Sequence, residues 1–271
     1  MESALARFAR TTFTHDGASK TVFVAGDGPA VIVMHELPGI TPDLLGFALR
    51  VVDAGFRAYV PWLFGALDKP ESRGLVARGM VRACLSRELH VFAANRSSPL
   101  ADWLRALARH AHAECGGRAV GAVGMCITGN FALALAVDPW VAAPVLSQPA
   151  LPWAAPWPPA LRRRQDALHL DDAQLATLRA RTRAGLRILA MRFAEDWTCP
   201  AARFARLRAA FGDAIETIEI ERDAGTRTHG GMRHAVLTLD LVDRPGEPTH
   251  AALTRVLAFL AERLKPVEER L

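Results

Sequence analysis

The sequence predicts an α/β fold, with a mostly parallel central sheet flanked by helices on both faces. Short apolar runs bounded by Gly, Pro or Asp alternate with longer amphipathic stretches, a pattern typical of parallel strands joined by crossover helices. The apolar runs are hydrophobic at successive positions, so both sides of each strand should be buried. All of residues 1–271 are expected to form a single domain.

The elements follow one another in a regular order. The predicted strands are Ala30–His35, Arg57–Val60, Ala119–Met125, Ala143–Leu146, Arg187–Arg192 and Ile215–Ile220. The predicted helices are Pro42–Ala54, Arg73–Phe92, Pro99–Glu114, Gly129–Val137, Asp171–Ala184, Ala201–Ala210, His234–Leu241 and Thr249–Leu264.

Residues 149–159, PALPWAAPWPP, interrupt this order. Their prolines exclude a helix or a central strand. Because the segment follows a predicted strand, it would leave the carboxyl edge of the sheet, where ligands bind in such folds. It is therefore either a rigid surface crossover or an apolar lid over the site.

Charge and composition argue against several functional classes. The net charge of +5 arises from arginines scattered among acidic residues, which indicates a solvated surface and not a nucleic-acid partner. No apolar run approaches the roughly 20 residues of a membrane span, and the N-terminal residues lack the apolar core of a secretory signal. We therefore expect a cytoplasmic protein without a membrane partner.

The cysteines and histidines do not predict a metal site. Cys84, Cys115, Cys126 and Cys199 form no CxxC pair, so free thiols are expected. His110 and His112 lie two residues apart on a predicted helix and face different directions. No metal and no cofactor are expected.

The most specific chemical signal lies around Cys126. A predicted strand leads into Gly124-Met125-Cys126-Ile127-Thr128-Gly129, and an alanine-rich helix follows. The pattern G-x-C-x-x-G places cysteine where a nucleophile elbow has serine, and the helix N-terminus favours a thiolate. From this segment alone, Cys126 is either a nucleophile or a buried thiol beside a tight turn.

Four sequence blocks follow one another along the chain: VIVMHELPGI at 31–40, the elbow at Cys126, MRFAEDWTCP at 191–200 and MRHAVLT at 232–238. With these blocks the sequence resembles the dienelactone hydrolase family of the α/β-hydrolase superfamily over roughly residues 20–264. The resemblance implies an α/β-hydrolase fold and a Cys-His-Asp triad. In it Cys126 attacks an ester carbonyl, His234 exchanges the proton and Asp196 orients the imidazole.

Two triad positions have rivals nearby. Glu195 precedes Asp196, and Asp196 is also a candidate cap for the helix that begins near Pro200; the spacing to the proline favours Asp196 in the triad. His229 competes with His234, but the helix-like segment HAVLTLDL after His234 favours His234.

The resemblance also gives Glu36 a role. In that family the equivalent glutamate lies beside the thiol and acts as a base when substrate displaces it. A carboxylate at the end of a buried strand is costly unless hydrogen-bonded, which itself indicates a site, although an exposed loop acid is the alternative. The backbone N–H groups of Leu37 and Ile127 are the expected oxyanion hole.

The pattern departs from the family where a substrate carboxylate would bind. Ala235 and Thr238 occupy positions where a well-studied member has serine and arginine, so half of its carboxylate clamp is missing. Other arginines are available, and an apolar or aromatic substrate is expected. The candidate substrate-binding residues are Trp62, Phe64, Trp153, Trp157 and Arg233, with Arg73, Arg78 and Arg82 as further arginines.

We therefore expect a cofactor-independent enzyme that hydrolyses small-molecule esters or lactones through a thioester intermediate, as a monomer or homodimer. Two alternatives stay open. One is a noncatalytic protein of the same fold that binds a hydrophobic small molecule. The other is an acyltransferase or thioesterase that uses the same triad.

Overall fold

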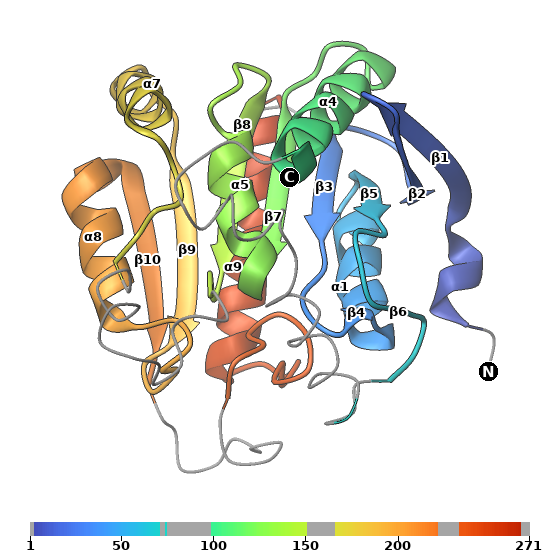
Figure 1. Ribbon diagram of the computed structural model, residues 1–271. Coiled ribbons are helices and arrows are strands. Elements are labelled where there is room, and N and C mark those ends of the chain that lie inside the picture. Colours follow the sequence, from blue (N-terminus) through green and yellow to red (C-terminus); the bar gives the residue numbers. More distant parts are fainter. Residues whose placement is uncertain (1–2, 71–73, 75–98, 151–165, 222–232, 267–271) are drawn as a thin grey trace.

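The computed structural model describes residues 3–70, 74, 99–150, 166–221 and 233–266. Its framework is an eight-stranded sheet in the order β1-β2-β5-β3-β7-β8-β9-β10 (Figure 1). The six predicted strands lie side by side and are parallel, which confirms the expected α/β class. They are β3 (Ala30–Met34), β5 (Arg57–Pro61), β7 (Val120–Met125), β8 (Val141–Ser147), β9 (Ile188–Phe193) and β10 (Ile215–Ile220).

An N-terminal hairpin that the apolar pattern did not predict completes the sheet. Strands β1 (Ala9–His15) and β2 (Ala18–Ala25) pair antiparallel, and β2 runs antiparallel to β5. Asp16 and Gly17 form the turn with φ of 47° and 75°, the positive values of a two-residue hairpin turn. Strand β1 is mostly exposed and polar, which explains why no hydrophobic run marks it.

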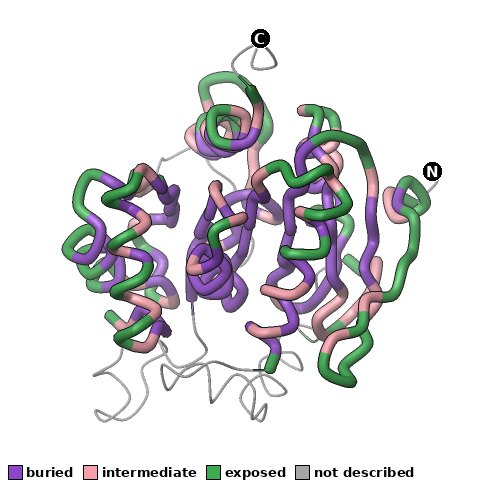
Figure 2. Tube along the Cα trace, turned by 90° about the horizontal axis from the view of Figure 1, so that it is seen from above, coloured by how far each residue is buried: buried purple, intermediate pink, exposed green. Residues whose placement is uncertain are grey.

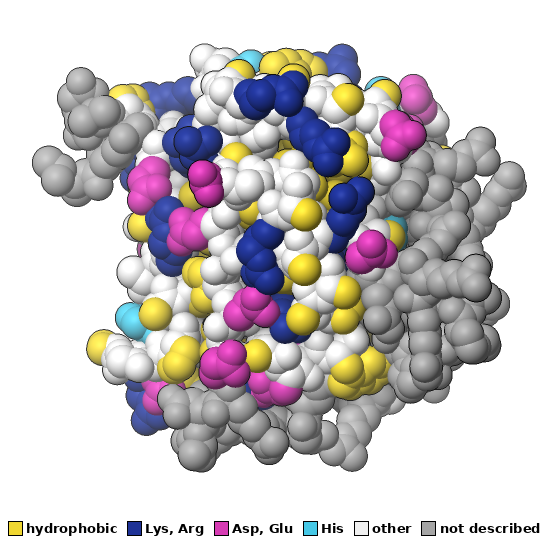
Figure 3. Space-filling model, turned by 90° about the vertical axis from the view of Figure 1, so that its left-hand side faces the viewer, with side chains coloured by type: hydrophobic (Ala, Val, Ile, Leu, Met, Phe, Trp, Pro, Cys, Tyr) yellow, Lys and Arg dark blue, Asp and Glu magenta, His cyan; other side chains and the backbone are white. Residues whose placement is uncertain are grey.

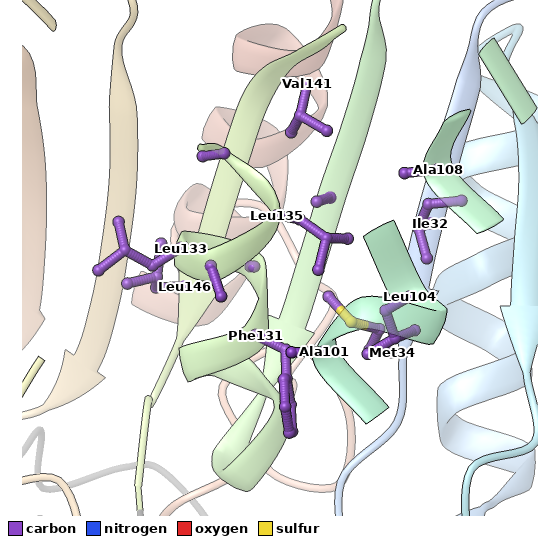
Figure 4. Close-up of a cluster of buried hydrophobic side chains, with 14 of the residues drawn as sticks. Ile32, Met34, Ala101, Leu104, Ala108, Phe131, Leu133, Leu135, Val141 and Leu146 are labelled. Carbon is purple, nitrogen blue, oxygen red and sulfur yellow. The ribbon is translucent and has the colours of Figure 1, made fainter. Parts of the chain in front are cut away.

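Helices cover both faces of the sheet. Ile32 and Met34 point into one core layer and Val31 and Val33 into the other, as the alternation of a strand requires. The first layer packs against α4 (Pro99–Glu114), α5 (Gly129–Leu135), α7 (Asp172–Arg183) and α8 (Ala201–Phe211), and the second against α1 (Pro42–Asp53) and α9 (Pro248–Leu264). Figure 4 shows the first layer where α4 and α5 meet the central strands.

Short elements fill the connections. They are the 3-10 turns η1 (Ala4–Arg7), η2 (Cys126–Thr128) and η4 (Gly212–Ala214), and a small second sheet made by β4 (Gly39–Ile40) and β6 (Ala66–Leu67). The predicted helix Arg73–Phe92 lies, apart from residue 74, outside the described residues. Of the proline-rich segment 149–159, only Pro149 and Ala150 are described.

The prediction of a helix at His234–Leu241 is wrong. The segment forms irregular turns, because the Asp240 carboxylate accepts the backbone N–H groups of His234 and Ala235 at 2.8 and 2.9 Å. The N–H of Asp240 in turn donates to the Ala235 carbonyl at 3.1 Å. Such local side-chain hydrogen bonds satisfy the backbone in place of a helical ladder.

Burial is concentrated at the centre of the sheet. Every residue of α5 is buried, and Figure 2 shows the central strands enclosed by helices whose outer sides are exposed. At the β10 edge, basic side chains alternate with acidic ones (Figure 3), as where Arg255 binds both Glu216 and Glu262. In the described part of the chain, no helix has the length and apolar character needed to cross a bilayer.

Candidate active site

Three neighbouring strands bring their carboxyl ends to one edge of the sheet. Met34 of β3 is in register with Gly124 of β7, and Met125 of β7 with Ser147 of β8. Glu36 and Cys126 therefore each follow their registered residue by two positions, and Gln148 follows Ser147 directly. Ligand sites of open α/β sheets form at such strand ends.

Cys126 occupies a sharp turn between β7 and α5. Its φ is 54°, a value that a residue with a side chain adopts only where the surroundings enforce it. The flanking glycines are required by close approach: a Cβ on Gly124 would lie 2.1 Å from the Thr128 carbonyl oxygen, and one on Gly129 would lie 2.9 Å from Pro149 Cα. The G-x-C-x-x-G pattern thus forms the tight strand-to-helix turn that it predicts.

Buried polar groups hold this turn in place. The Thr128 hydroxyl accepts the Met125 N–H at 2.9 Å and lies 2.9 Å from the Met34 carbonyl, which ties the turn to β3. The Asn130 side-chain amide donates to the Ile127 carbonyl at 3.3 Å, and its oxygen accepts from buried Arg203 at 2.8 Å. Fixing the turn from several sides stabilises the unusual backbone at Cys126.

His234 and Asp196 are directly hydrogen-bonded. Nδ1 of His234 lies 2.6 Å from Asp196 Oδ2, and the Asp196 carboxylate is buried. The other oxygen, Oδ1, accepts the Thr198 hydroxyl at 2.6 Å and the N–H groups of Thr198 and Cys199 at 2.9 and 3.3 Å. Asp196 therefore both orients the imidazole and shapes the turn before α8, whose N-cap is Pro200.

Electrostatics links the imidazole to the thiol. Burial lowers the pKa of His234, but the charge of Cys126 and hydrogen bonds with Asp196 and Cys126 outweigh burial and hold that pKa well above its usual value. Burial raises the pKa of Asp196, but its hydrogen bond with His234, the imidazolium charge and Thr198 together lower it. The hydrogen bond of 2.6 Å therefore joins His234 to Asp196, and the influence of Cys126 on the pKa of His234 places the thiol near the imidazole.

Glu195, the other acid considered for the triad, forms an ion pair with Arg233. Glu195 Oε1 lies 2.7 Å from Nη2 of Arg233, whose guanidinium is 1% exposed and also stacks on Phe193 with its carbon 4.7 Å from the ring centroid. Arg233, a candidate for substrate binding, is thus occupied by an ion pair inside the protein. His229 and the candidates Arg73, Arg78, Arg82, Trp153 and Trp157 lie outside the described residues.

Glu36 is a buried acid and not an exposed loop residue. Its side chain accepts a hydrogen bond from the Thr238 hydroxyl at Oε1 and one of 3.0 Å from Gln148 Nε2 at Oε2. Burial raises the pKa of Glu36, the His234 charge and the bonds from Thr238 and Gln148 oppose this, and the charge of Asp240 adds to it. Sequence reasoning missed Gln148, because nothing local marks a lone glutamine after a strand.

His35 shapes the wall beside the site. Its Nε2 accepts the Leu63 N–H at 3.1 Å, so Nδ1 carries the proton and donates to the Glu36 carbonyl at 2.9 Å. Burial lowers its pKa to about 4, although the bond to the Glu36 carbonyl raises it, and the ring is therefore neutral at pH 7. Phe64 packs edge-on against this ring at 4.5 Å, and half-buried Trp62 donates to the Gly65 carbonyl at 3.3 Å.

The expected oxyanion-hole residues follow two of these side chains. Ile127 comes directly after Cys126 at the start of the elbow helix, and half-buried Leu37 comes directly after Glu36 at the end of the adjacent strand. Within the described ranges, no three His, Cys, Asp or Glu side chains are grouped closely enough to hold a metal ion.

Comparison with solved structures shows the same fold in proteins of low sequence identity. A dienelactone hydrolase from Anabaena variabilis ATCC 29413 superposes with a TM-score of 0.59 and 13% identity, over 95% of this chain and 98% of that one. A dienelactone hydrolase-like promiscuous phosphotriesterase from metagenomic libraries has a TM-score of 0.59 and 15% identity, over 95% and 98%. The thioesterase domain from the curacin biosynthetic pathway has a TM-score of 0.53 and 11% identity, over 92% and 99%.

Sequence comparison supplies the family. No curated protein sequence gives a significant match. The profile of the dienelactone hydrolase family, however, matches residues 19–220, which include β3 to β10 and both Cys126 and Asp196. The chain belongs to the dienelactone hydrolase family.

Proposed function

We propose that this protein hydrolyses carboxylic esters or lactones with Cys126 as the nucleophile. The observation that carries the proposal is the 2.6 Å hydrogen bond between His234 and Asp196, together with Cys126 on a turn of positive φ at the carboxyl edge of the sheet. The charge of Cys126 raises the pKa of His234, which supports a position of the thiol near the imidazole. Membership of the dienelactone hydrolase family supports ester or lactone chemistry at such a site.

The reaction proceeds in two halves. As Sγ of Cys126 attacks the carbonyl carbon, its proton moves to Nε2 of His234, and the developing oxyanion is stabilised by the N–H groups of Leu37 and Ile127. The carbon–oxygen bond of the ester breaks, the alcohol leaves with the proton from His234, and a thioester remains. Water then attacks the thioester, gives its proton to His234 and releases the acid as the thiol reforms.

Glu36 supplies a second base. It ends the strand next to the nucleophile strand, and its carboxylate is held by Thr238 and Gln148. A carboxylate at this place can take the thiol proton when a substrate enters and pass it on to His234, which then protonates the leaving alcohol. The thiolate then forms only in the presence of substrate. Burial raises the pKa of Glu36, which makes its carboxylate a stronger base as long as that carboxylate is ionised.

The substrate is proposed to be a neutral apolar or aromatic ester or lactone. Thr238 is uncharged and its hydroxyl binds Glu36, and the Arg233 guanidinium binds Glu195, so neither residue offers a substrate carboxylate a free positive charge. Phe64 and Trp62 offer aromatic surface near the Glu36 strand end. Esters are favoured over amides because an amine leaves poorly from a thiol adduct.

Turnover of 4-nitrophenyl butyrate and dihydrocoumarin by the wild type and Cys126→Ala tests the proposal. Wild type is expected to hydrolyse at least one of them, and Cys126→Ala to lose essentially all of that activity. Cys115→Ala is the matched control, since Cys115 lies beside Tyr59, on α4's side of the sheet. An active Cys126→Ala variant would overturn the mechanism.

Alkylation distinguishes hydrolysis from ligand binding without catalysis. Burial raises the pKa of the Cys199 and Cys115 thiols, so both should react slowly with iodoacetamide. Peptide mass spectrometry is expected to find Cys126 labelled first. If Cys126 reacts no faster than Cys115, with or without added ester, the noncatalytic alternative is favoured.

A further inference from the structure

We propose that Gln148 and Thr238 are positioning residues, which together hold the Glu36 carboxylate in place beside the nucleophile. This inference rests on the proposed function, because it assumes that Glu36 takes part in the cysteine mechanism. It goes beyond that function by assigning two uncharged residues as the groups that control Glu36.

The sheet order shows why the contact between Gln148 and Glu36 matters. Strands β3 and β8, which carry these residues at their ends, are not neighbours, because β7 lies between them. The 3.0 Å hydrogen bond from Gln148 Nε2 to Glu36 Oε2 therefore crosses the end of β7, where the elbow of Cys126 begins. The bond joins the two strand ends on either side of the nucleophile.

Gln148 is itself rigidly held. The residue is fully buried, its φ is 33°, and its N–H donates to the Met191 carbonyl at 2.7 Å. The Ser147 hydroxyl donates to its side-chain oxygen Oε1. Because the oxygen is engaged by Ser147, the amide nitrogen must face Glu36, which fixes the orientation of the side chain.

Thr238 holds the other carboxylate oxygen of Glu36. It lies on the loop that carries His234, and its hydroxyl donates to Glu36 Oε1. The loop is fixed by the bond from the Thr238 N–H to the Ala235 carbonyl at 3.2 Å and by Asp240. Glu36 thus connects the nucleophile side of the site with the histidine loop.

Both donors stabilise the charged form of a carboxylate without adding a charge. Burial raises the pKa of Glu36, whereas the His234 charge and the bonds from Thr238 and Gln148 lower it. A carboxylate has about four acceptor positions, so two bonds leave room for the proton of a thiol. Loss of either donor should leave Glu36 more readily protonated and less able to act as a base.

The dependence of kcat/KM on pH, with a neutral aryl ester between pH 5 and 9, tests this proposal. Thr238→Val and Gln148→Asn remove one donor each; asparagine tolerates positive φ but is too short to reach Glu36. Both variants are expected to lose about tenfold in kcat/KM at the acid end and much less at pH 9, as the acid limb shifts to higher pH. Thr238→Ser should restore the wild-type profile, and Thr177→Val on exposed α7 is the matched control.

A Glu36→Gln background makes the test specific. If Thr238 acts through Glu36, Thr238→Val should change kcat/KM little once Glu36 is replaced. A uniform loss at every pH, or an unchanged shift in the Glu36→Gln background, would overturn the proposal. Circular dichroism melting of each variant establishes that it is folded.

The two levels of failure can be told apart. If Cys126→Ala keeps wild-type turnover, the proposed function fails. If Cys126→Ala is inactive while folded Thr238→Val and Gln148→Asn keep the wild-type pH profile, only the positioning role fails.

Discussion

Nδ1 of His234 lies 2.6 Å from Oδ2 of Asp196. The preceding acid, Glu195, points to a different partner and binds Arg233 at 2.7 Å. Two consecutive carboxylates are therefore separated into an acid that orients the imidazole and an acid that neutralises a buried guanidinium.

Replacing these two neighbours should give opposite results. Asp196→Asn is expected to lower kcat roughly a thousandfold or more, because the amide presents the wrong group to the imidazole. Glu195→Ala should keep kcat within a few-fold of wild type but lower the free energy of unfolding by about 2 kcal/mol, because it leaves Arg233 without its acid. Steady-state kinetics measures kcat, and urea denaturation measures the free energy of unfolding, for each variant. Equal losses of kcat in the two variants would contradict the assignment of Asp196.

Asp240 offers a test of backbone positioning. The N–H groups of His234 and Ala235 both donate hydrogen bonds to Oδ2 of Asp240. Oδ1 of Asp240 has no hydrogen-bond partner in the described part of the chain. Asp240→Asn can keep both bonds through its remaining oxygen and should hold kcat/KM within about threefold near neutral pH, whereas Asp240→Ala should lose at least about tenfold.

The charge of Asp240 should appear in the pH profile. Because this charge raises the pKa of Glu36, Asp240→Asn is expected to move the acid limb of kcat/KM to lower pH. Asp243→Asn is the matched control, since Asp243 binds Arg50 and His250 at the surface. An acid limb that moves to higher pH in Asp240→Asn would refute this electrostatic role.

The elbow glycine should be intolerant of a methyl group. In Gly124→Ala the new Cβ would lie 2.1 Å from the Thr128 carbonyl oxygen, so backbone must shift at the nucleophile. We expect a loss of about 2–3 kcal/mol in stability and a strong loss of turnover. Gly46→Ala, at a half-buried position of α1 where the nearest atom to the new Cβ is Arg50 Nη1 at 3.4 Å, should be neutral or slightly stabilising. Thermal melting of both variants is the measurement, and equal melting temperatures would disprove the steric account.

His35 should make the fold sensitive to acid. Its pKa is lowered from 6.5 to about 4, so the unfolded chain binds a proton that the folded chain does not between these values. The contribution of neutral His35 to the free energy of unfolding is fully present above pH 6.5 and falls as the pH drops towards 4. The total loss of this free energy is about 3 kcal/mol. Urea denaturation at pH 7.5 and 4 should show wild type losing about that much more than His35→Gln. Identical losses of the free energy of unfolding in the two proteins would show that His35 binds a proton as readily in the folded chain as in the unfolded chain.

Hydrophobic patterning was sufficient for the interior of the sheet. Strands β3, β7, β8 and β9 were predictable because burial on both faces makes their sequences continuously apolar. The hairpin of β1 and β2 was missed because β1 is polar and exposed, and its pairing depends on β5, which comes later in the chain. The segment after His234 was mistaken for a helix because its apolar spacing did not reveal that Asp240 would cap the backbone locally.

The chemistry of the candidate site divides in the same way. Gly124, Cys126 and Gly129 are recognisable in sequence because a strained turn between a strand and a helix demands small residues at fixed spacing. Gln148 carries no such local signature, since it acts on Glu36, a residue that only the fold brings near it.

The sequence by itself determined the α/β class, the elbow around Cys126 and the short set of acids and histidines from which a site could be built. Only the tertiary structure decided that Asp196 and not Glu195 meets His234, and that Glu36 is held by Thr238 and Gln148. The physical reason is the separation along the chain of the residues that interact. Strand burial and turn sterics depend on residues close in sequence. The bond between Gln148 and Glu36 joins residues 112 positions apart, and it forms because the folded sheet brings the ends of β3 and β8 to either side of β7.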